Sequence, residues 1–168
     1  RWRHPELGLV PPLDFIPILK CWPKDGGRFI TLPQVITRNP KSGARNVGMY
    51  RLQVVDSQTL LVHWQRHKGG AEHAKRAQAA QQARIPAAVV LGGSPAAIWC
   101  SSAPLPPEID EYLLAGYLNG EAVEFVKCVS QPLEVPSQAE MVIEGYVDLE
   151  DYRPEGPFGD HTGYYTPV

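Results

Sequence analysis

Two acidic residues near the C-terminal end of the chain are the clearest candidates for chemistry. They lie in the segment Glu155-Gly156-Pro157-Phe158-Gly159-Asp160, which a histidine follows directly. Glycine and proline at these positions disfavour a helix, so the sequence predicts a rigid loop that presents both acids through its backbone geometry. A carboxylate desolvated in such a loop has a raised pKa, as a general acid near neutral pH requires. The alternative is an ordinary turn whose acids are solvated.

The segment Arg45-Asn46-Val47-Gly48-Met49-Tyr50-Arg51 offers groups that bind anions or a cofactor. We expect it to enter a strand over residues 47–55. Alternate side chains of a strand share a face, which places Asn46 and Gly48 on the side opposite Arg51. The planar guanidinium of Arg51 suits a carboxylate or a phosphate, and Gly48 lets a ligand approach the backbone closely. The alternative is a solvated strand end with a structural glycine.

The segment His63-Trp64-Gln65-Arg66-His67-Lys68-Gly69-Gly70 combines cations, an indole ring and two glycines before a predicted helix. Amide groups at a helix N-terminus and the helix dipole favour an anion there. The segment contains a possible histidine ligand for a metal, and Trp64 can pack against a ring system. No Walker or dinucleotide glycine pattern is present. A basic surface loop is the alternative.

Glu111 is a further candidate, on a helix predicted over residues 107–118. It lies among Ile109, Leu113 and Leu114. A carboxylate that faces inward among such residues needs a cation or a hydrogen-bond donor. The alternative is a helix-terminal acid that the dipole stabilises.

Composition indicates an ordinary globular protein. The 168 residues suit one domain, residues 1–168, and the hydrophobic share of 43% with a charged share of 20% excludes extensive disorder. A net charge of −2 gives no reason to expect nucleic acid or an anionic membrane as partner, and no apolar run approaches the roughly 20 residues of a membrane span. Three dispersed cysteines favour a reduced, cytoplasmic setting. We also expect a piece of a longer chain, because the sequence opens at Arg1 without methionine and ends on strand-favouring residues.

The elements that would position these residues are short, since 17 prolines and 15 glycines interrupt the chain. We predict helices over residues 71–84, 95–101 and 107–118. We predict strands over residues 29–37, 47–55, 60–64, 87–91, 123–129 and 140–147, the second and third of them forming a hairpin. This pattern favours an α+β fold with a mostly antiparallel, barrel-like sheet over repeated parallel βαβ units.

Taken in order, several blocks resemble the UbiD family of (de)carboxylases over nearly the whole chain. The blocks are Ile30–Pro33, Asn46–Arg51, His67–Ala71, Ala103-Pro104, Val126–Cys128, Leu133–Pro136 and Glu155–Tyr165. The resemblance implies a reversible, non-oxidative decarboxylase whose central domain is a split β-barrel, FMN-binding-like, with peripheral helices. It also implies prenylated FMN as cofactor, together with Mn²⁺ and K⁺.

The resemblance assigns roles by position. Arg51, Glu155 and Asp160 match the catalytic network, in which Glu155 holds Arg51, Arg51 orients the substrate carboxylate and a protonated Asp160 delivers a proton. The cofactor-lining positions are Met49, Tyr50, Arg51, His63, Trp64, Gln65, Lys68 and Gly69. The Mn²⁺ ligands are Asn46, Glu111 and, as a third, His67, mostly hard oxygen donors that suit a hard ion.

The same resemblance implies partners for the chain. The substrate would be an aromatic or α,β-unsaturated carboxylic acid, a flavin prenyltransferase would supply the cofactor, and the full-length form would be a homo-oligomer. Two other classes stay open at this point. One is a plain FMN-dependent split-barrel oxidoreductase, which has little use for Arg51, Glu155 and Asp160 together. The other is a non-catalytic, truncated binding domain.

Overall fold

The computed structural model describes residues 2–6 and 8–166 and divides the chain into two compact units. The first unit comprises Arg1–Thr31, Arg51–His63 and Arg153–Val168. The second comprises Leu32–Tyr50 and Trp64–Tyr152. Each unit is therefore assembled from stretches that are distant in the sequence.

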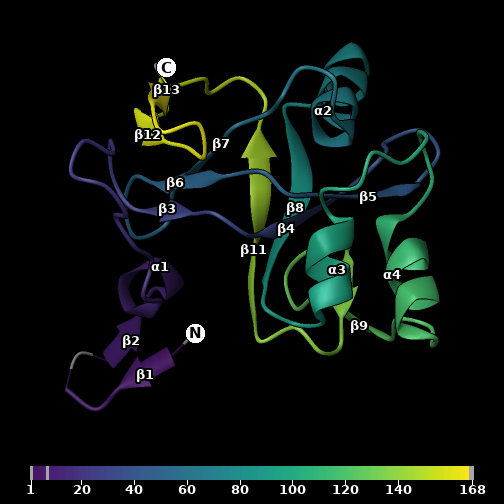
Figure 1. Cartoon of the computed structure of the whole chain (residues 1–168), viewed down its shortest axis with the longest axis horizontal. Helices are drawn as coiled ribbons and strands as arrows, with labels where there is room; N and C mark the ends of the chain where they lie inside the picture. Colours follow the sequence, from purple (N-terminus) through teal and green to yellow (C-terminus); the bar gives the residue numbers. More distant parts are fainter. Residues whose placement is uncertain (1, 7, 167–168) are drawn as a thin grey trace. The chain divides into compact units, whose positions relative to one another are not determined.

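The first unit contains short antiparallel strands and one short helix. Its elements are β1 (Trp2–His4), β2 (Gly8–Val10), α1 (Pro12–Phe15), β3 (Phe29–Ile30), β6 (Leu52–Val54), β7 (Leu60–Val62), β12 (Phe158–Gly159) and β13 (Tyr165–Thr166). A three-stranded sheet has the order β3-β6-β7, and β12 pairs with β13 in the hairpin drawn in yellow in Figure 1. The predicted hairpin between residues 47–55 and 60–64 is confirmed for its central part, since Leu52 pairs with Val62.

The second unit is built on a four-stranded antiparallel sheet of order β11-β8-β4-β5. Its strands are β4 (Gln34–Arg38), β5 (Arg45–Gly48), β8 (Arg84–Leu91) and β11 (Met141–Asp148). The long strands β8 and β11 pair over their full length, from Met141 opposite Leu91 to Asp148 opposite Arg84. A separate hairpin joins β9 (Phe125–Lys127) and β10 (Glu134–Pro136). All pairs in this unit are antiparallel, as predicted.

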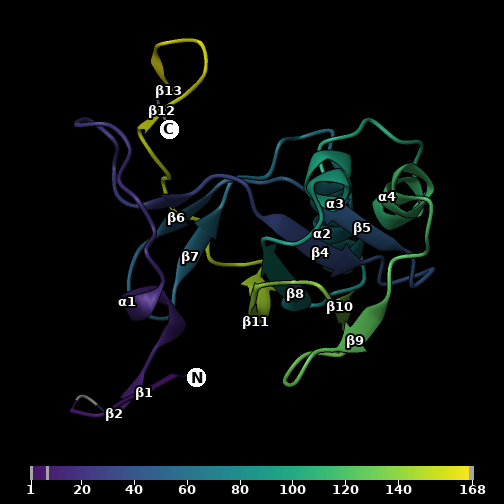
Figure 2. The same cartoon turned by 60° about the horizontal axis from the view of Figure 1, so that its bottom comes forward.

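Three helices complete the second unit: α2 (Gly69–Ala79), α3 (Pro95–Cys100) and α4 (Glu111–Asn119). Figures 1 and 2 show α3 and α4 side by side. The side chain of Asp110 caps α4 by accepting a hydrogen bond from the Tyr112 amide, and Gly120 ends the helix with a left-handed φ of 74°.

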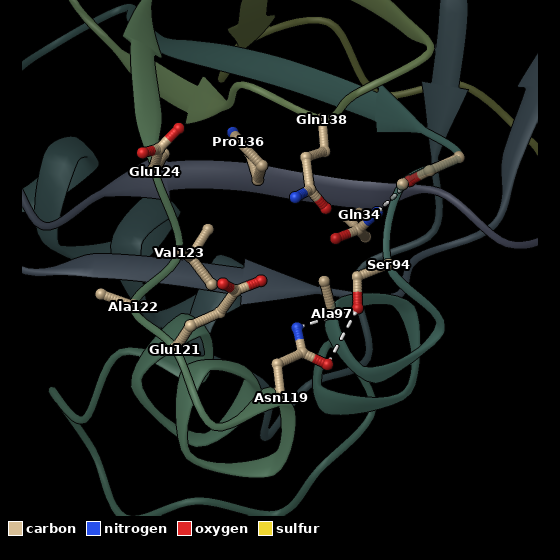
Figure 3. Close-up of a pocket in the computed structure, with 12 residues that line it drawn as sticks. Gln34, Ser94, Ala97, Asn119, Glu121, Ala122, Val123, Glu124, Pro136 and Gln138 are labelled. Carbon is tan, nitrogen blue, oxygen red and sulfur yellow. Dashed lines mark hydrogen bonds between the residues drawn. The ribbon is translucent and has the colours of Figure 1, made fainter.

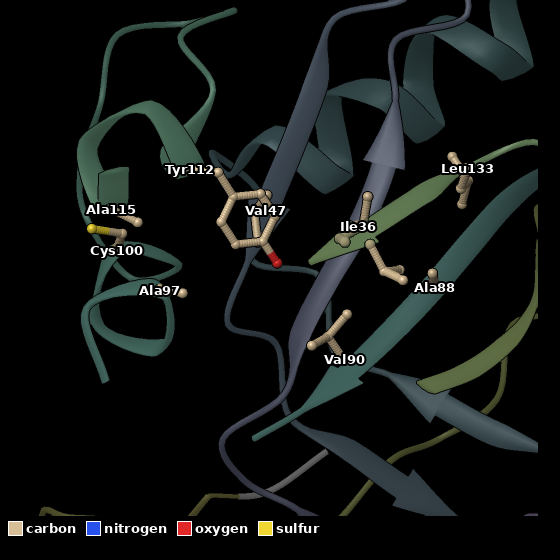
Figure 4. Close-up of a cluster of buried hydrophobic side chains, with 10 residues drawn as sticks. Ile36, Val47, Ala88, Val90, Ala97, Cys100, Tyr112, Ala115 and Leu133 are labelled. Atoms are coloured by element: carbon tan, nitrogen blue, oxygen red, sulfur yellow. The ribbon is translucent and has the colours of Figure 1, made fainter. Parts of the chain in front are cut away.

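A buried cluster joins α3 and α4 to the sheet (Figure 4). Its members are Ile36, Val47, Ala88, Val90, Ala97, Cys100, Tyr112, Ala115, Leu133 and Val135. Tyr112 and Ala115 of α4 thereby pack on the same core as Val47 of β5. Because Glu111 directly precedes Tyr112, this packing brings the Glu111 carboxylate to β5.

Two predicted helices have different bounds from those expected. The helix predicted over 71–84 ends at Ala79, and Gln81 has a left-handed φ of 56°. Arg84 already belongs to β8, because pairing with β11 outweighs the helix propensity of the intervening alanines and glutamines. The helix predicted from residue 107 begins only at Glu111, after Glu108 with φ of 67°.

Two predicted strands are interrupted. The strand expected over 47–55 is wrong as a continuous element, because β5 ends at Gly48 and β6 begins at Leu52 in another sheet. Arg51 therefore lies outside the strand of Asn46 and Gly48, and the predicted opposite faces do not apply. The strand expected over 29–37 divides into β3 and β4 around Pro33, which has no amide proton to donate to a ladder.

The described strands form separate sheets of two to four strands, none of which closes into a barrel. The mixed α/β, mostly antiparallel class is as predicted, whereas the split-barrel detail stays a prediction. Within the described residues, no helix is long and apolar enough to cross a membrane.

Candidate active site

Arg51 and Glu155 form a two-point ion pair in the first unit. Arg51 Nε lies 2.7 Å from Glu155 Oε1, and Arg51 Nη2 lies 2.7 Å from Glu155 Oε2. The exposed fractions of the two side chains are 16% and 8%. Two parallel charge-assisted hydrogen bonds fix the plane of the guanidinium as well as its position. The ion pair expected from the sequence is therefore present.

Three neighbours surround the Arg51 guanidinium on its other sides. Arg51 Nη1 donates to Thr166 Oγ1 over 3.4 Å, and Arg51 Cζ lies 4.7 Å from the centre of the Phe158 ring. His63 Nδ1 lies 3.2 Å from Glu155 Oε2 and 3.3 Å from Arg51 Nη2. A neutral Nδ1 with a free lone pair accepts from Arg51, whereas a protonated one donates to Glu155. The tautomer of His63 thus selects its partner within the ion pair.

Asp160 has its carboxylate engaged by its own turn. Its Oδ1 accepts hydrogen bonds from the Thr162 amide, at 2.8 Å, and from the Thr162 hydroxyl. These hydrogen bonds, with smaller contributions from the charges of His161 and Arg51, hold the pKa of Asp160 below its usual range. Asp160 is therefore ionised at neutral pH in this conformation, which differs from the expectation that it stays protonated.

The backbone between the two acids is held by side chains that the sequence did not single out. The Gly156 amide donates to Gln53 Oε1 over 2.7 Å, and the Gly159 amide donates to Asp25 Oδ1 over 2.9 Å. Gln53 is polar within an otherwise apolar strand, and Asp25 precedes two glycines. These two features were visible in the sequence, but neither of them indicates a hydrogen-bond partner more than 100 positions away.

Tyr50 is the centre of a second group of predicted residues, in the second unit. Its hydroxyl accepts hydrogen bonds from Asn46 Nδ2 over 3.3 Å and from the Gly70 amide over 3.0 Å. The Trp64 ring packs edge-on against the Tyr50 ring, with centroids 4.9 Å apart. Burial raises the pKa of Tyr50, so the hydroxyl keeps its proton. The group therefore offers one amide side chain, one hydroxyl and two aromatic rings.

Two glycines at the start of α2 are required by the close approach of this group. A Cβ atom on Gly69 would lie 1.8 Å from Asn46 Oδ1, and one on Gly70 would lie 2.1 Å from Trp64 Cζ3. Any other residue would displace the Asn46 amide oxygen or the indole. The oxygen of Asn46 is thus placed against the amino end of α2, where the helix dipole favours negative charge.

Glu111 reaches β5 next to Asn46. Its Oε2 accepts a hydrogen bond from the Val47 amide over 2.8 Å. Burial raises the pKa of Glu111, and its charge in turn raises the pKa of Tyr50. Asn46 and Glu111, 65 positions apart in the sequence, therefore act on the same tyrosine, and both supply oxygen atoms.

The remaining predicted residues are less closely gathered. Gln65, His67 and Lys68 are exposed in the turn before α2, and Met49 is half-buried, with its amide bonded to the Ser101 carbonyl. In the described part of the chain, no group of three or more histidine, cysteine, aspartate or glutamate side chains could hold a metal ion. The predicted set of Asn46, Glu111 and His67 contains only two side chains of these types, so it stays a prediction.

A cavity of about 210 Å³ lies elsewhere in the second unit (Figure 3). Gln34, Ser94, Asn119 and Glu121 are among its lining residues, and Ser94 and Asn119 hydrogen-bond each other. It contains none of the residues predicted to be functional.

Comparison with known proteins identifies the family. A sequence model of the UbiD family, described as the 3-octaprenyl-4-hydroxybenzoate carboxy-lyase Rift-related domain, matches residues 7–168. The chain belongs to the UbiD family. An uncharacterized protein of Aquifex aeolicus is 56% identical over 157 residues, which are 93% of this chain and 32% of that protein. The chain thus spans about a third of the length of the curated relatives it matches.

Solved structures of UbiD-class enzymes have the same fold. The enzyme HmfF from Pelotomaculum thermopropionicum, in complex with FMN, matches with a TM-score of 0.89 and 34% identity over 94% of this chain and 35% of its own. An evolved dimeric form of HmfF, in complex with prFMN, matches with a TM-score of 0.89 and 32% identity over 99% and 38%. The vanillic acid decarboxylase of Sedimentibacter hydroxybenzoicus, in closed form, matches with a TM-score of 0.87 and 28% identity over 94% and 34%.

Proposed function

We propose that this chain is the prenylated-FMN-binding domain of a reversible, non-oxidative decarboxylase, a carboxy-lyase. The two-point ion pair between Arg51 and Glu155 is the observation that carries the proposal. It fixes a guanidinium whose remaining edge has only longer contacts, 3.4 Å to Thr166 Oγ1 and 3.3 Å to His63 Nδ1. A substrate carboxylate displaces such weak partners readily, and the planar fork then binds it with a defined orientation.

The residues of the second unit fit the cofactor. Trp64, half-buried against the Tyr50 ring, offers aromatic surface to a ring system, and the amino end of α2, with Lys68 before it, favours a phosphate. When bound, prenylated FMN would supply an electron sink for the pair of electrons that CO₂ leaves behind. The proposed cofactor-lining residues are Met49, Tyr50, Arg51, His63, Trp64, Gln65, Lys68 and Gly69.

The donor set also fits a hard divalent cation. The Asn46 amide oxygen and the Glu111 carboxylate are hard ligands, and the missing Cβ of Gly69 leaves the Asn46 oxygen beside the helix terminus. Asn46, Glu111 and His67 would hold Mn²⁺, which would supply positive charge next to an anionic cofactor. K⁺ is proposed as a second ion, from the family resemblance alone.

The proton needed at the carbon that loses CO₂ would come from Asp160. In the present conformation two hydrogen bonds from Thr162 favour the ionised form of Asp160. Proton delivery therefore requires Asp160 to leave Thr162 and to be protonated when substrate displaces water from its surroundings. In the direction of carboxylation the same carboxylate accepts the proton, as microscopic reversibility demands.

Other features of the proposal concern the whole protein. The substrate would be an aromatic or α,β-unsaturated acid, the cofactor would come from a flavin prenyltransferase, and the full-length form would be a homo-oligomer. Residues 1–168 would be one central domain of the split-barrel type. These statements are supported by the family match and by the UbiD-class neighbours.

The proposal is tested with the full-length protein, produced together with a flavin prenyltransferase. We expect prenylated FMN in the absorption spectrum and in the mass of the released cofactor. We also expect exchange of ¹³C-labelled bicarbonate into at least one acid of a panel of aromatic and unsaturated acids. Arg51→Lys should abolish the exchange, because lysine cannot form two parallel hydrogen bonds, while Arg84→Lys on the surface serves as control. A protein that binds plain FMN and consumes NAD(P)H would be an oxidoreductase instead.

The metal is tested separately by Mn²⁺ titration of the flavin-loaded protein, followed by electron paramagnetic resonance. Glu111→Gln keeps the acceptor for the Val47 amide but removes the charge. Loss of a residue that only supports a metal ligand typically weakens metal binding about 10- to 100-fold. Because Glu111 is proposed to be a ligand itself, we expect Glu111→Gln to weaken Mn²⁺ binding by more than this. Glu121→Gln is the matched exposed control. Equal affinities in the two variants would remove Glu111 from the ligand set.

A further inference from the structure

The four residues that separate Glu155 from Asp160 are held by two side chains from other parts of the first unit. We propose that Asp25 is a positioning residue for Asp160 and that Gln53 is a positioning residue for Glu155. The kinetic effect expected from this inference rests on the proposed function. Its structural content, that these side chains fix the loop between the two acids, is independent of that function.

Asp25 links its own turn to the acid-bearing loop. It is only 4% exposed, and its two oxygens accept from two backbone amides, Oδ2 from Trp22 and Oδ1 from Gly159, each over 2.9 Å. No ion pair of Asp25 is found within the described residues, so its two carboxylate oxygens serve two backbone N–H donors rather than a cation. Gly159 directly precedes Asp160, which makes this hydrogen bond the nearest external constraint on the acid.

The backbone of this turn lies in direct contact with the loop. The Gly26 amide donates to the Pro157 carbonyl over 2.8 Å. A Cβ on Gly26 would lie 2.0 Å from the Gly156 carbonyl oxygen, and a Cβ on Gly159 would lie 2.6 Å from Trp22 Cδ1. Only glycine therefore fits where the two segments meet, and the hydrogen bonds from Gly159 to Asp25 and from Gly26 to Pro157 hold the segments together. The loop is thus clamped immediately before Asp160.

Gln53 constrains the other end of the loop. It belongs to β6, the central strand of its sheet, where it pairs with Phe29 on one side and Leu61 on the other. Its side-chain oxygen accepts from the Gly156 amide over 2.7 Å, and Gly156 directly follows Glu155. Gln53 is also two positions after Arg51. One side chain therefore places Glu155 relative to the arginine that it binds.

The two positioning residues should affect different kinetic constants. Asp160 acts as proton donor only in the chemical step, so a displaced Asp160 lowers kcat and leaves the KM for the acid nearly unchanged. A displaced Glu155 releases Arg51, which binds the substrate carboxylate, so it raises KM as well. Displacement of a reacting group by about 1 Å costs on the order of 100-fold in rate.

The central variant is Asp25→Asn. An amide side chain has one acceptor and one donor group, so its oxygen can accept from only one of the two backbone amides. Its NH₂ group then faces the N–H of the other backbone amide, with which it cannot form a hydrogen bond. The control is Asp56→Asn in the same unit, where the carboxylate accepts from the Gln58 amide within its own exposed turn. Hydrogen–deuterium exchange followed by mass spectrometry reports directly on the loop, because the Gly159 amide is protected by its hydrogen bond to Asp25.

We expect Asp25→Asn to accelerate exchange at least about tenfold in a peptide that covers residues 155–162, and to leave peptides from β8 unchanged. In the cofactor-loaded full-length enzyme, kcat should fall about 10- to 100-fold with KM within about twofold of wild type. Gln53→Met should instead raise KM. If Asp25→Asn is insoluble, Trp22→Leu replaces it, because Trp22 is 55% exposed and its ring packs against Gly159.

Unchanged exchange in residues 155–162 would overturn the proposal, whatever the enzyme does. Faster exchange with kcat and KM equal to those of Asp56→Asn would also overturn it, because the loop position would then not matter to the acid. A wild-type protein without decarboxylase activity would contradict the proposed function alone. In that case the exchange experiment still decides whether Asp25 fixes the loop.

Discussion

Arg51 and Glu155 lie 104 positions apart in the sequence and share two hydrogen bonds of 2.7 Å each. The pair holds the guanidinium in one plane, and His63 contacts both partners. An arginine oriented in this way can recognise a carboxylate by shape as well as by charge. The relationship between these two residues is therefore the structural basis for substrate binding in the proposed reaction.

Glu155→Gln should weaken substrate binding and slow turnover together. The amide keeps one acceptor for Arg51 but places its NH₂ group against the second guanidinium nitrogen, so the plane of Arg51 is no longer fixed. We expect a higher KM, a lower kcat, and a loss of about 1–3 kcal/mol in the free energy of unfolding in urea. Glu150→Gln, exposed and outside the pair, should change none of these values. An unaltered KM in Glu155→Gln would contradict the role of the ion pair.

Asp160→Asn should bind the cofactor normally and lose about 10²- to 10⁴-fold in turnover, because the amide keeps the shape but cannot donate a carboxyl proton. The measurement is decarboxylation together with solvent-deuterium exchange at the product carbon. His161 is the competing donor in the same loop, so His161→Gln is examined in parallel. Undiminished deuterium exchange in Asp160→Asn would transfer the role to His161.

Gly69→Ala should reduce cofactor binding without reducing the thermal stability of the protein. Alanine favours a helix over glycine by about 1 kcal/mol, but its Cβ would lie 1.8 Å from Asn46 Oδ1. We expect thermal stability close to wild type and a marked loss of flavin and Mn²⁺ after purification, because Asn46 must turn away. Gly145→Ala is the matched control, since a Cβ there meets nothing within 4 Å. Full cofactor content in Gly69→Ala would show that Asn46 is not needed.

Because of the buried His73, the free energy of unfolding should be lower in mild acid than at neutral pH. Burial, with a smaller contribution from Arg76, lowers the pKa of His73 from 6.5 to about 4. Between these values the unfolded chain binds a proton that the folded chain does not, so stability falls as the pH decreases from about 6.5 to about 4. The loss should be on the order of 2 kcal/mol, at about 1.4 kcal/mol per pKa unit reduced by partial solvation.

Urea unfolding of the metal-free protein between pH 4.5 and pH 7.5 measures this dependence, with the pH range chosen around the two pKa values. His73→Gln keeps a partner for the Thr37 hydroxyl, which lies 2.9 Å from His73 Nδ1, and should flatten the curve. His67→Gln, at an exposed histidine of the same unit, should retain the wild-type slope. Equal slopes in both variants would exclude His73 as the cause.

The sequence by itself determined the elements that local chemistry specifies. Pro95 after Ser94 begins α3, Asn119-Gly120 ends α4, and the turn at Asp56-Ser57-Gln58 joins β6 to β7. Each of these signals is complete within a few residues, because caps and turns depend on neighbouring backbone groups. The ordered blocks that resemble the UbiD family were likewise readable along the chain, and the family match agrees with them.

Only the tertiary structure decided how distant side chains meet. Arg51 lies outside the strand that contains Arg45, and Asp160 accepts hydrogen bonds from Thr162. The side chains of Asp25 and Gln53 bind the loop between the two acids. Strand pairing ended the predicted helix of residues 71–84 early, although its residues favour a helix. These outcomes depend on contacts between segments up to 134 positions apart. Such contacts are selected by the packing of the whole unit, because no local pattern records which partner a buried polar group will find.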